Sequence, residues 1–148
     1  QRLIYLCSIN FSLFTLIQNS PKISIIQYWV PSCENASRNL HKYANLHREN
    51  SEDVDFYFIA LTKRISLLEE LERKVNFNSS IYLMDTLNSG SDLFENKSTF
   101  NKQFLKLFGL KKKEDFLIAY IHKKSGTLIF TDKLKIDEKK IRKMMKKK

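Results

Sequence analysis

The run from Ile23 to Val30 constrains the fold more than any other segment of the chain. It reads Ile-Ser-Ile-Ile-Gln-Tyr-Trp-Val, which is almost continuously apolar, β-branched or aromatic. Such a run is typical of a central strand that is buried on both faces of a sheet. Pro31 follows at once and cannot continue a central strand, so we expect the chain to turn there. A sheet buried on both faces needs helices on both sides, which indicates an α/β protein.

The rest of the chain alternates between strand and helix patterns. The turn Lys-Lys-Ser-Gly at residues 123–126 favours an antiparallel hairpin, so the sheet is expected to be mixed. Residues 87–98 read as a polar loop. Gly109 is expected to end the helix before it, and Asp137 to begin the last one. The predicted strands are 3–7, 23–30, 54–61, 81–84, 116–122 and 127–131, and the predicted helices are 11–17, 33–46, 65–75, 100–108 and 137–145.

The length and charge of the chain suggest one domain with a basic end. Its 148 residues contain no Pro-, Gly- or Ser-rich linker, so a single domain over residues 1–148 is expected. Residues 111–148 hold 14 Lys and Arg against 5 Asp and Glu, and we predict a basic C-terminal helix at about 135–148. Such a helix is either simply solvated or in contact with nucleic acid or an anionic membrane. No aromatic residue follows Phe130, so a pattern for stacking bases is missing.

The chain has few residues for metal or cofactor chemistry. Its two cysteines, Cys7 and Cys33, cannot form a disulfide framework, and no Cys/His spacing resembles a metal site. There is no glycine-rich phosphate loop, so we expect neither a metal nor a cofactor. Cys7 is expected to be a small core residue. His41, His47 and His122 are expected to be surface histidines.

Cys33 is the candidate nucleophile. It lies just after the central strand, at the expected N-terminus of a helix, where the helix dipole stabilises a thiolate. Glu34 opposes this effect by charge repulsion. In a Cys-x-x-Cys pair one thiolate attacks a disulfide and the second cysteine resolves the mixed disulfide. The second position holds Ala36, so the internal resolving step is impossible.

The residues around Cys33 resemble a known active site. Thioredoxins and protein disulfide isomerases read Phe-Trp-Ala-Pro-Trp-Cys-x-x-Cys, whereas residues 28–36 read Tyr-Trp-Val-Pro-Ser-Cys-Glu-Asn-Ala. The order of strands and helices is also similar, and the extra helix and strand at 65–84 resemble TlpA-type thioredoxin-like proteins. The resemblance implies a thioredoxin-like three-layer sandwich, with a mixed central sheet flanked by helices. The matching motif residues are Tyr28, Trp29, Pro31 and Cys33.

Four features of that family are missing. Ala36 replaces the resolving cysteine, and Ser32 replaces the tryptophan before the nucleophile. Gln27 stands where the family has a buried acid that assists proton transfer. The family's cis-proline should lie near residues 114–116, where this chain has none. These departures together imply that dithiol chemistry has been lost.

The sequence therefore predicts a degenerate thioredoxin-fold protein that binds another protein or serves as a subunit of a complex. The alternative is an enzyme in which Cys33 exchanges disulfides as a monothiol and an external thiol such as glutathione resolves them. Its site would include the motif neighbours Trp29, Pro31, Ser32 and Ala36. The TlpA-type likeness implies the bacterial periplasm or cell envelope, with a membrane anchor upstream of Gln1. An intracellular location is the alternative.

Overall fold

The structure is a computed structural model of the chain. It describes residues 3–6, 11–29, 36–62, 64–75, 81–84, 92–110, 115–133 and 135–146. The elements are β1 (Leu3–Leu6), α1 (Phe11–Asn19), β2 (Ile23–Trp29), α2 (Ala36–Asn50), β3 (Val54–Ala60), α3 (Ile65–Val75), β4 (Ile81–Met84), α4 (Leu93–Leu107), β5 (Ile118–His122), β6 (Thr127–Thr131) and α5 (Glu138–Met145).

The six strands form one mixed sheet in the order β1-β4-β3-β2-β5-β6. The neighbouring pairs among β1, β4, β3 and β2 are all parallel, whereas β5 is antiparallel to both β2 and β6. The β5–β6 pair is the predicted hairpin, and Gly126 in its turn has a φ of 68°. The mixed sheet expected from the sequence is therefore confirmed. The extra strand β4 lies between β3 and β1.

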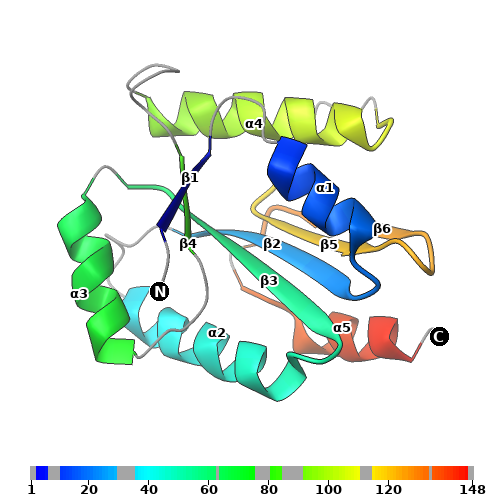
Figure 1. The fold of residues 1–148 in the computed structure, drawn as a ribbon, viewed down its shortest axis with the longest axis horizontal. Helices are drawn as coiled ribbons and strands as arrows, with labels where there is room; N and C mark the ends of the chain where they lie inside the picture. The colour runs from blue at the N-terminus through cyan, green and yellow to red at the C-terminus, as the bar shows by residue number, and fades with distance from the viewer. Residues whose placement is uncertain are drawn as a thin grey trace.

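Helices cover both faces of the sheet, so the molecule has three layers (Figure 1). One core cluster joins the sheet to α2, α3 and α5 through residues such as Tyr43, Leu68 and Ile141. The other cluster joins the opposite face to α1 and α4 through residues such as Leu13 and Phe104. This is the α/β sandwich that the sequence predicted, and all seven residues of β2 are buried within it.

The ends of two helices agree with their sequence signals. Asp137 caps α5, and its carboxylate accepts hydrogen bonds from the backbone N–H groups of Lys139 and Lys140. Gly109 lies just beyond α4 with a φ of 73°, in the left-handed region that ends helices at little cost for glycine. None of the helices in the described ranges is long and apolar enough to span a bilayer.

α4 begins earlier than expected. Residues 93–98 were predicted as part of a polar loop, but they form the first turns of this helix. The prediction was wrong because the buried face of α4 carries Lys97 and Asn101 as well as Phe100 and Phe104, so it does not have a clean apolar stripe. The partners that allow these two polar residues to be buried lie elsewhere in the chain.

Candidate functional site

The predicted motif lies at the junction between β2 and α2. Trp29 is the last residue of β2 and is buried, and Ala36 is the first residue of α2. Pro31, Ser32 and Cys33 fall in the connection between them, outside the described residues, as does Cys7. The flanks of the motif are thus placed at a strand-to-helix junction as expected, while the reactivity of Cys33 stays a prediction.

Backbone hydrogen bonds hold the end of β2 on both sides. On the β3 side, the N–H of Leu61 donates to the carbonyl of Trp29 at 2.8 Å. On the β5 side, the N–H of Tyr28 donates to the carbonyl of Leu117 at 2.9 Å. The end of β2, which leads into the connection that contains Cys33, is therefore held on both sides at a central position in the sheet.

Trp29 closes the core on the α2 face. It belongs to the same apolar cluster as Tyr43 and Phe58, whose rings stack with 5.3 Å between their centroids. The indole Nε1 is buried and has no hydrogen-bond partner among the described residues. A buried N–H is normally satisfied by a protein or water oxygen.

Gln27 and Tyr43 form a neutral pair behind this junction. Gln27 is 2% exposed, and its side-chain amide donates to the Tyr43 hydroxyl at 2.6 Å. Burial raises the pKa of Tyr43 above its ordinary value, against an opposing effect of the hydrogen bond with Gln27. Both side chains are therefore uncharged at neutral pH, and Gln27 cannot accept a proton as a carboxylate would.

The opposite face of the sheet carries a polar cluster that the sequence did not reveal. This cluster, here called the Lys97–Asp115 cluster, consists of Tyr28, Lys97, Ser98, Asn101 and Asp115. The Lys97 ammonium lies 2.8 Å from an Asp115 oxygen, and 4.9 Å from the centre of the Tyr28 ring. Tyr28 donates to the Asn101 side-chain oxygen at 2.5 Å, and the Asn101 amide donates to Asp115. Ser98 also donates to Asp115, at 3.3 Å.

The two charges of this cluster differ strongly in exposure. The side chain of Lys97 is only 5% exposed, whereas that of Asp115 is 48% exposed. Partial burial raises the pKa of Asp115, but hydrogen bonds from Lys97, Asn101 and Ser98 outweigh it and leave the pKa below its ordinary value. Burial, followed by the nearby Asp115 charge, raises the pKa of Tyr28. The cluster therefore consists of the Lys97–Asp115 ion pair, with Lys97 packed against the ring of the neutral Tyr28 phenol.

The cluster fastens the segment before β5 to α4. Asn101 donates a second hydrogen bond, 3.2 Å long, to the carbonyl of Phe116. The next residue, Leu117, accepts from the end of β2, so this segment lies beside the strand that leads to Cys33. This is the segment in which the thioredoxin resemblance would place a cis-proline, and the sequence has no proline there. Among the described residues no peptide bond is cis. Side chains of α4 hold the segment instead.

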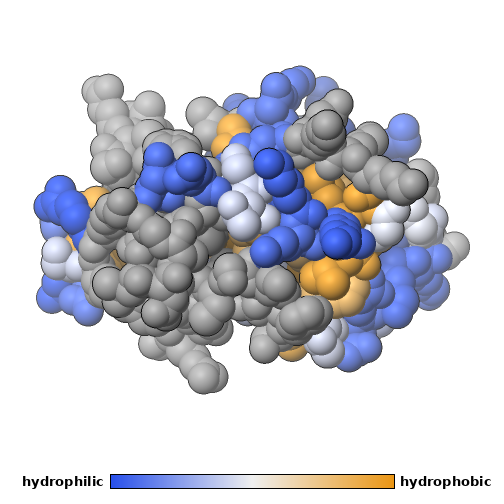
Figure 2. Space-filling model, turned by 90° about the horizontal axis from the view of Figure 1, so that it is seen from above, coloured by the Kyte–Doolittle hydropathy of each residue, from blue (hydrophilic) through white to orange (hydrophobic). Residues whose placement is uncertain are grey.

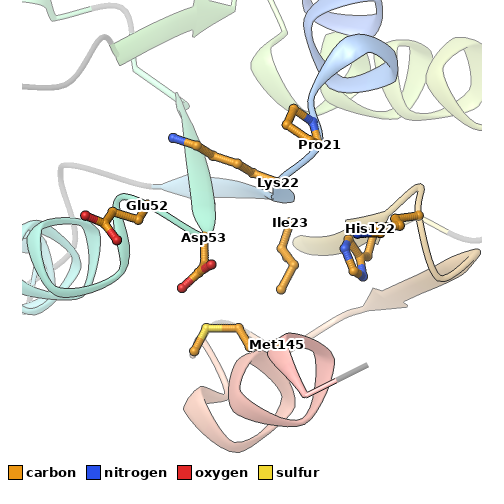
Figure 3. A pocket seen from close by; sticks show the side chains of 8 residues that line it. Pro21, Lys22, Ile23, Glu52, Asp53, His122 and Met145 are labelled. Carbon is orange, nitrogen blue, oxygen red and sulfur yellow. The ribbon is translucent and has the colours of Figure 1, made fainter. Parts of the chain in front are cut away.

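A pocket of about 360 Å³ lies at the other end of the sheet, where β2 and β3 begin. Figure 3 shows Ile23 and Asp53 pointing towards Met145 of α5, while Glu52 points away. The ammonium of Lys22 already has a partner within the protein, because it donates a hydrogen bond to the carbonyl of Ser51 at 2.7 Å. Among the described residues no group of three His, Cys, Asp or Glu could hold a metal. Trp29, the predicted site residue whose side chain the structure describes, does not line this pocket.

The histidines are not all on the surface. His41 is exposed, but His122 is buried at the end of β5, with its Nδ1 2.8 Å from the Ser125 hydroxyl. The surface assignment of His122 was wrong because β5 is buried along its whole length, including its last residue. The Ser125 hydroxyl in the following turn supplies the polar partner.

His47 is half-buried, and the stability of the protein should respond to its protonation. Its ring lies edge-on to Phe56, 5.9 Å between centroids, and burial lowers its pKa, against an opposing effect of Asp55. A lowered pKa means that the folded state favours neutral His47. Neutral His47 therefore contributes to the free energy of unfolding at pH values above its ordinary pKa of about 6.5. This contribution is lost as the pH falls through the lowered pKa of the folded state.

We therefore expect the unfolding free energy to fall less between about pH 7 and pH 5 in His47→Gln and His47→Phe than in the unmodified protein. Urea denaturation at several pH values measures this slope. His47→Phe keeps a ring against Phe56, so it separates the loss of the titrating group from the loss of packing. An unchanged slope in both variants would show that His47 does not titrate differently in the folded state.

Comparisons with known proteins agree with this architecture. No protein-family model and no curated protein matches the chain. It is similar to a thioredoxin-like protein solved in its oxidized form, with a TM-score of 0.58, 14% identity, and 95% of this chain and 87% of that chain covered. It is also similar to a thioredoxin-related protein from Neisseria meningitidis serogroup B, with a TM-score of 0.53, 16% identity, and 86% and 84% covered.

A third similar structure is a secreted Mycobacterium tuberculosis disulfide oxidoreductase homologous to E. coli DsbE. Its TM-score is 0.50 at 12% identity, with 82% of this chain and 78% of that chain covered. At such low identity these likenesses show the fold and not the activity. The chain therefore has the thioredoxin-like fold, and its neighbours in that fold include a disulfide oxidoreductase.

Proposed function

We propose that this protein is a thioredoxin-fold protein without dithiol-disulfide oxidoreductase activity, and that it binds another protein or serves as a subunit of a complex. The observation that carries the proposal is Ala36 at the first position of α2. A thiol there would be needed to resolve a mixed disulfide formed at Cys33. A methyl group cannot do this.

The Gln27–Tyr43 pair supports the same conclusion. Proton transfer to or from a thiol is helped by a positioned acid or base whose pKa lies near the working pH. Gln27 does not titrate, and the pKa of Tyr43 is raised further from neutrality. The face of the sheet behind the junction thus offers a neutral amide and phenol where the resemblance implies a carboxyl group.

An insulin-reduction assay tests the proposed loss of activity. With dithiothreitol as the reductant, we expect the protein to reduce insulin no faster than its Cys33→Ser variant, because neither has a resolving cysteine at position 36. Ala36→Cys is the matched gain-of-function variant. It should form an internal disulfide that thiol alkylation and mass spectrometry detect. A rate for the unmodified protein well above that of Cys33→Ser would overturn the proposal.

The same variants address the monothiol alternative. If Cys33 works with an external thiol, its thiolate should attack glutathione disulfide, which gives a mixed disulfide on the unmodified protein and releases one glutathione thiolate. Reduced glutathione should then resolve this mixed disulfide, and turnover of a glutathionylated substrate should be lost in Cys33→Ser. As expected from the sequence, a helix N-terminus near Cys33 would favour a thiolate, and the neighbouring Glu34 would oppose it. Turnover dependent on both Cys33 and glutathione would replace the binding role with this enzyme activity.

We further propose a location in the bacterial periplasm or cell envelope. The support is that one structure with this fold is described as secreted. Contact of the basic C-terminal helix with nucleic acid or an anionic membrane stays a prediction. In the structure Ile141 and Met144 of α5 are buried in the core, so any such contact would use only its exposed Lys and Arg side chains.

A further inference from the structure

The outer edge of β6 is a second surface with the features of a binding site. β6 ends the sheet, and no strand in the described part of the chain pairs with its outer side. Its sequence, Thr-Leu-Ile-Phe-Thr, contains no charge and no proline. Natural edge strands normally carry such residues, because unpaired N–H and C=O groups otherwise accept a further strand. β6 lacks this protection in its own sequence.

An apolar hollow of about 170 Å³ adjoins this edge. The β6 hollow, as we call it, is lined by Ile17 and Gln18 of α1, Phe108, and Ile121, Gly126 and Leu128 of the hairpin. The ammonium of Lys123 donates to the Gln18 carbonyl at 2.7 Å, which ties the end of α1 to the hairpin beside the hollow. Seen from the side of α1 and α4, apolar surface gathers near α1 among hydrophilic residues (Figure 2).

The alternation of β6 connects its edge to the hollow. Leu128 is exposed and lines the hollow, whereas Ile129 packs against the core on the opposite face. Phe130 points back to the same side as Leu128 and packs against the α1–α4 core. Because successive side chains of a strand alternate between faces, a strand added beside β6 would place every second side chain on the face that carries the hollow, where the one nearest Leu128 could enter it.

The charges around β6 indicate what kind of strand would bind. Lys123 and Lys124 precede it, and Lys133 and Lys135 follow it, against the single acid Asp132. All five side chains are exposed. A second copy of the chain fits poorly, because pairing two β6 strands in either direction brings these lysines together, and each copy carries a formal charge of +10. An acidic strand is complementary.

We propose that the β6 edge binds an extended peptide segment of a partner protein. The segment is apolar or β-branched at alternate positions and acidic at both ends. Main-chain hydrogen bonds to β6 hold it, one apolar side chain enters the β6 hollow, and the lysines meet its acidic ends. The inference rests on the proposed function only in taking protein binding as the role. It does not depend on the state of Cys33.

A synthetic peptide tests the proposal on the full-length protein. The peptide has about nine residues, Glu-Asp-Thr-Ile-Thr-Val-Thr-Asp-Glu, enough to span β6 with acids beyond both ends. We expect its addition to shift the NMR amide signals of Thr127–Thr131 and of residues around the hollow. The variant Lys124→Gln/Lys133→Gln should bind about fivefold more weakly at low salt, and added salt should remove most of that difference.

The matched control is Arg64→Gln/Arg73→Gln, which removes the same charge at exposed positions of the α3 region. It should bind the peptide as tightly as the unmodified protein. Equal binding of a peptide with lysines in place of its acids, or signal shifts confined to α5, would overturn the proposal. So would self-association through β6 without peptide, which would assign the edge to a second copy. None of these outcomes would alter the insulin result, so the two proposals can fail separately.

Discussion

Replacing Asp115 by alanine is expected to lower the free energy of unfolding by about 3 kcal/mol at neutral pH. The change leaves the Lys97 ammonium buried without its carboxylate partner, 2.8 Å away in the unmodified protein. A buried charge that loses its partner keeps its desolvation cost and loses the attraction that offsets it. Its remaining contact with the face of the Tyr28 ring compensates only in part.

Removing the other partner should cost much less. In Lys97→Met the Asp115 carboxylate is half in water, and Asn101 and Ser98 still donate to it, so we expect a loss of about 1 kcal/mol or less. The double variant should resemble Lys97→Met alone, because no buried charge is then left. Urea denaturation followed by Trp29 fluorescence and circular dichroism measures all three. Equal losses in the two single variants would show that the difference in burial does not control the pair.

The central sheet was predictable because its strands carry their burial in their own sequence. β2, β3 and β5 each have a run of apolar and β-branched residues that few other structures accommodate. The junction between Trp29 and Ala36 was also predictable from nearby residues, because Pro31 cannot continue a central strand. Local signals such as Asp137 before α5 and Gly109 after α4 also needed only nearby residues.

The Lys97–Asp115 cluster could not be predicted in this way. A lysine in a polar stretch normally indicates solvent exposure. Lys97 is buried only because the fold brings against it Tyr28 of β2, which precedes α4 in the sequence, and Asp115 of the segment before β5, which follows α4. The first turns of α4 were therefore expected to be a loop. The hydrogen bond between Gln27 and Tyr43 could not be predicted either. The sequences of β2 and α2 each indicate which residues are buried, but not which polar atoms of the two elements meet.

The second large effect is expected from Gln27→Glu, which introduces an acid at the position where the fold family implies one. The side chain keeps its size, but a carboxyl group now lies at a site that is 2% exposed. Burial should raise its pKa by about two units above the ordinary value of about 4.3. We expect the variant to be about 3 kcal/mol less stable than the unmodified protein above neutral pH.

The direction of the pH dependence identifies the cause. An acid whose pKa is raised on folding favours the folded state only while it is protonated. The stability of Gln27→Glu should therefore be nearly intact below about pH 4.3 and fall as the pH rises through the raised pKa. Urea denaturation from acidic to mildly alkaline pH measures the difference between the variant and the unmodified protein at each pH.

Gln27→Met is the matched control, because it is similar in size and does not titrate. It loses the hydrogen bond to Tyr43 and should cost about 1 kcal/mol at every pH. If Gln27→Glu were as independent of pH as Gln27→Met, the space behind Trp29 would have to be well solvated. A neutral side chain at position 27 would then be no obstacle to proton transfer, and the case for lost dithiol chemistry would rest on Ala36, Ser32 and the missing proline.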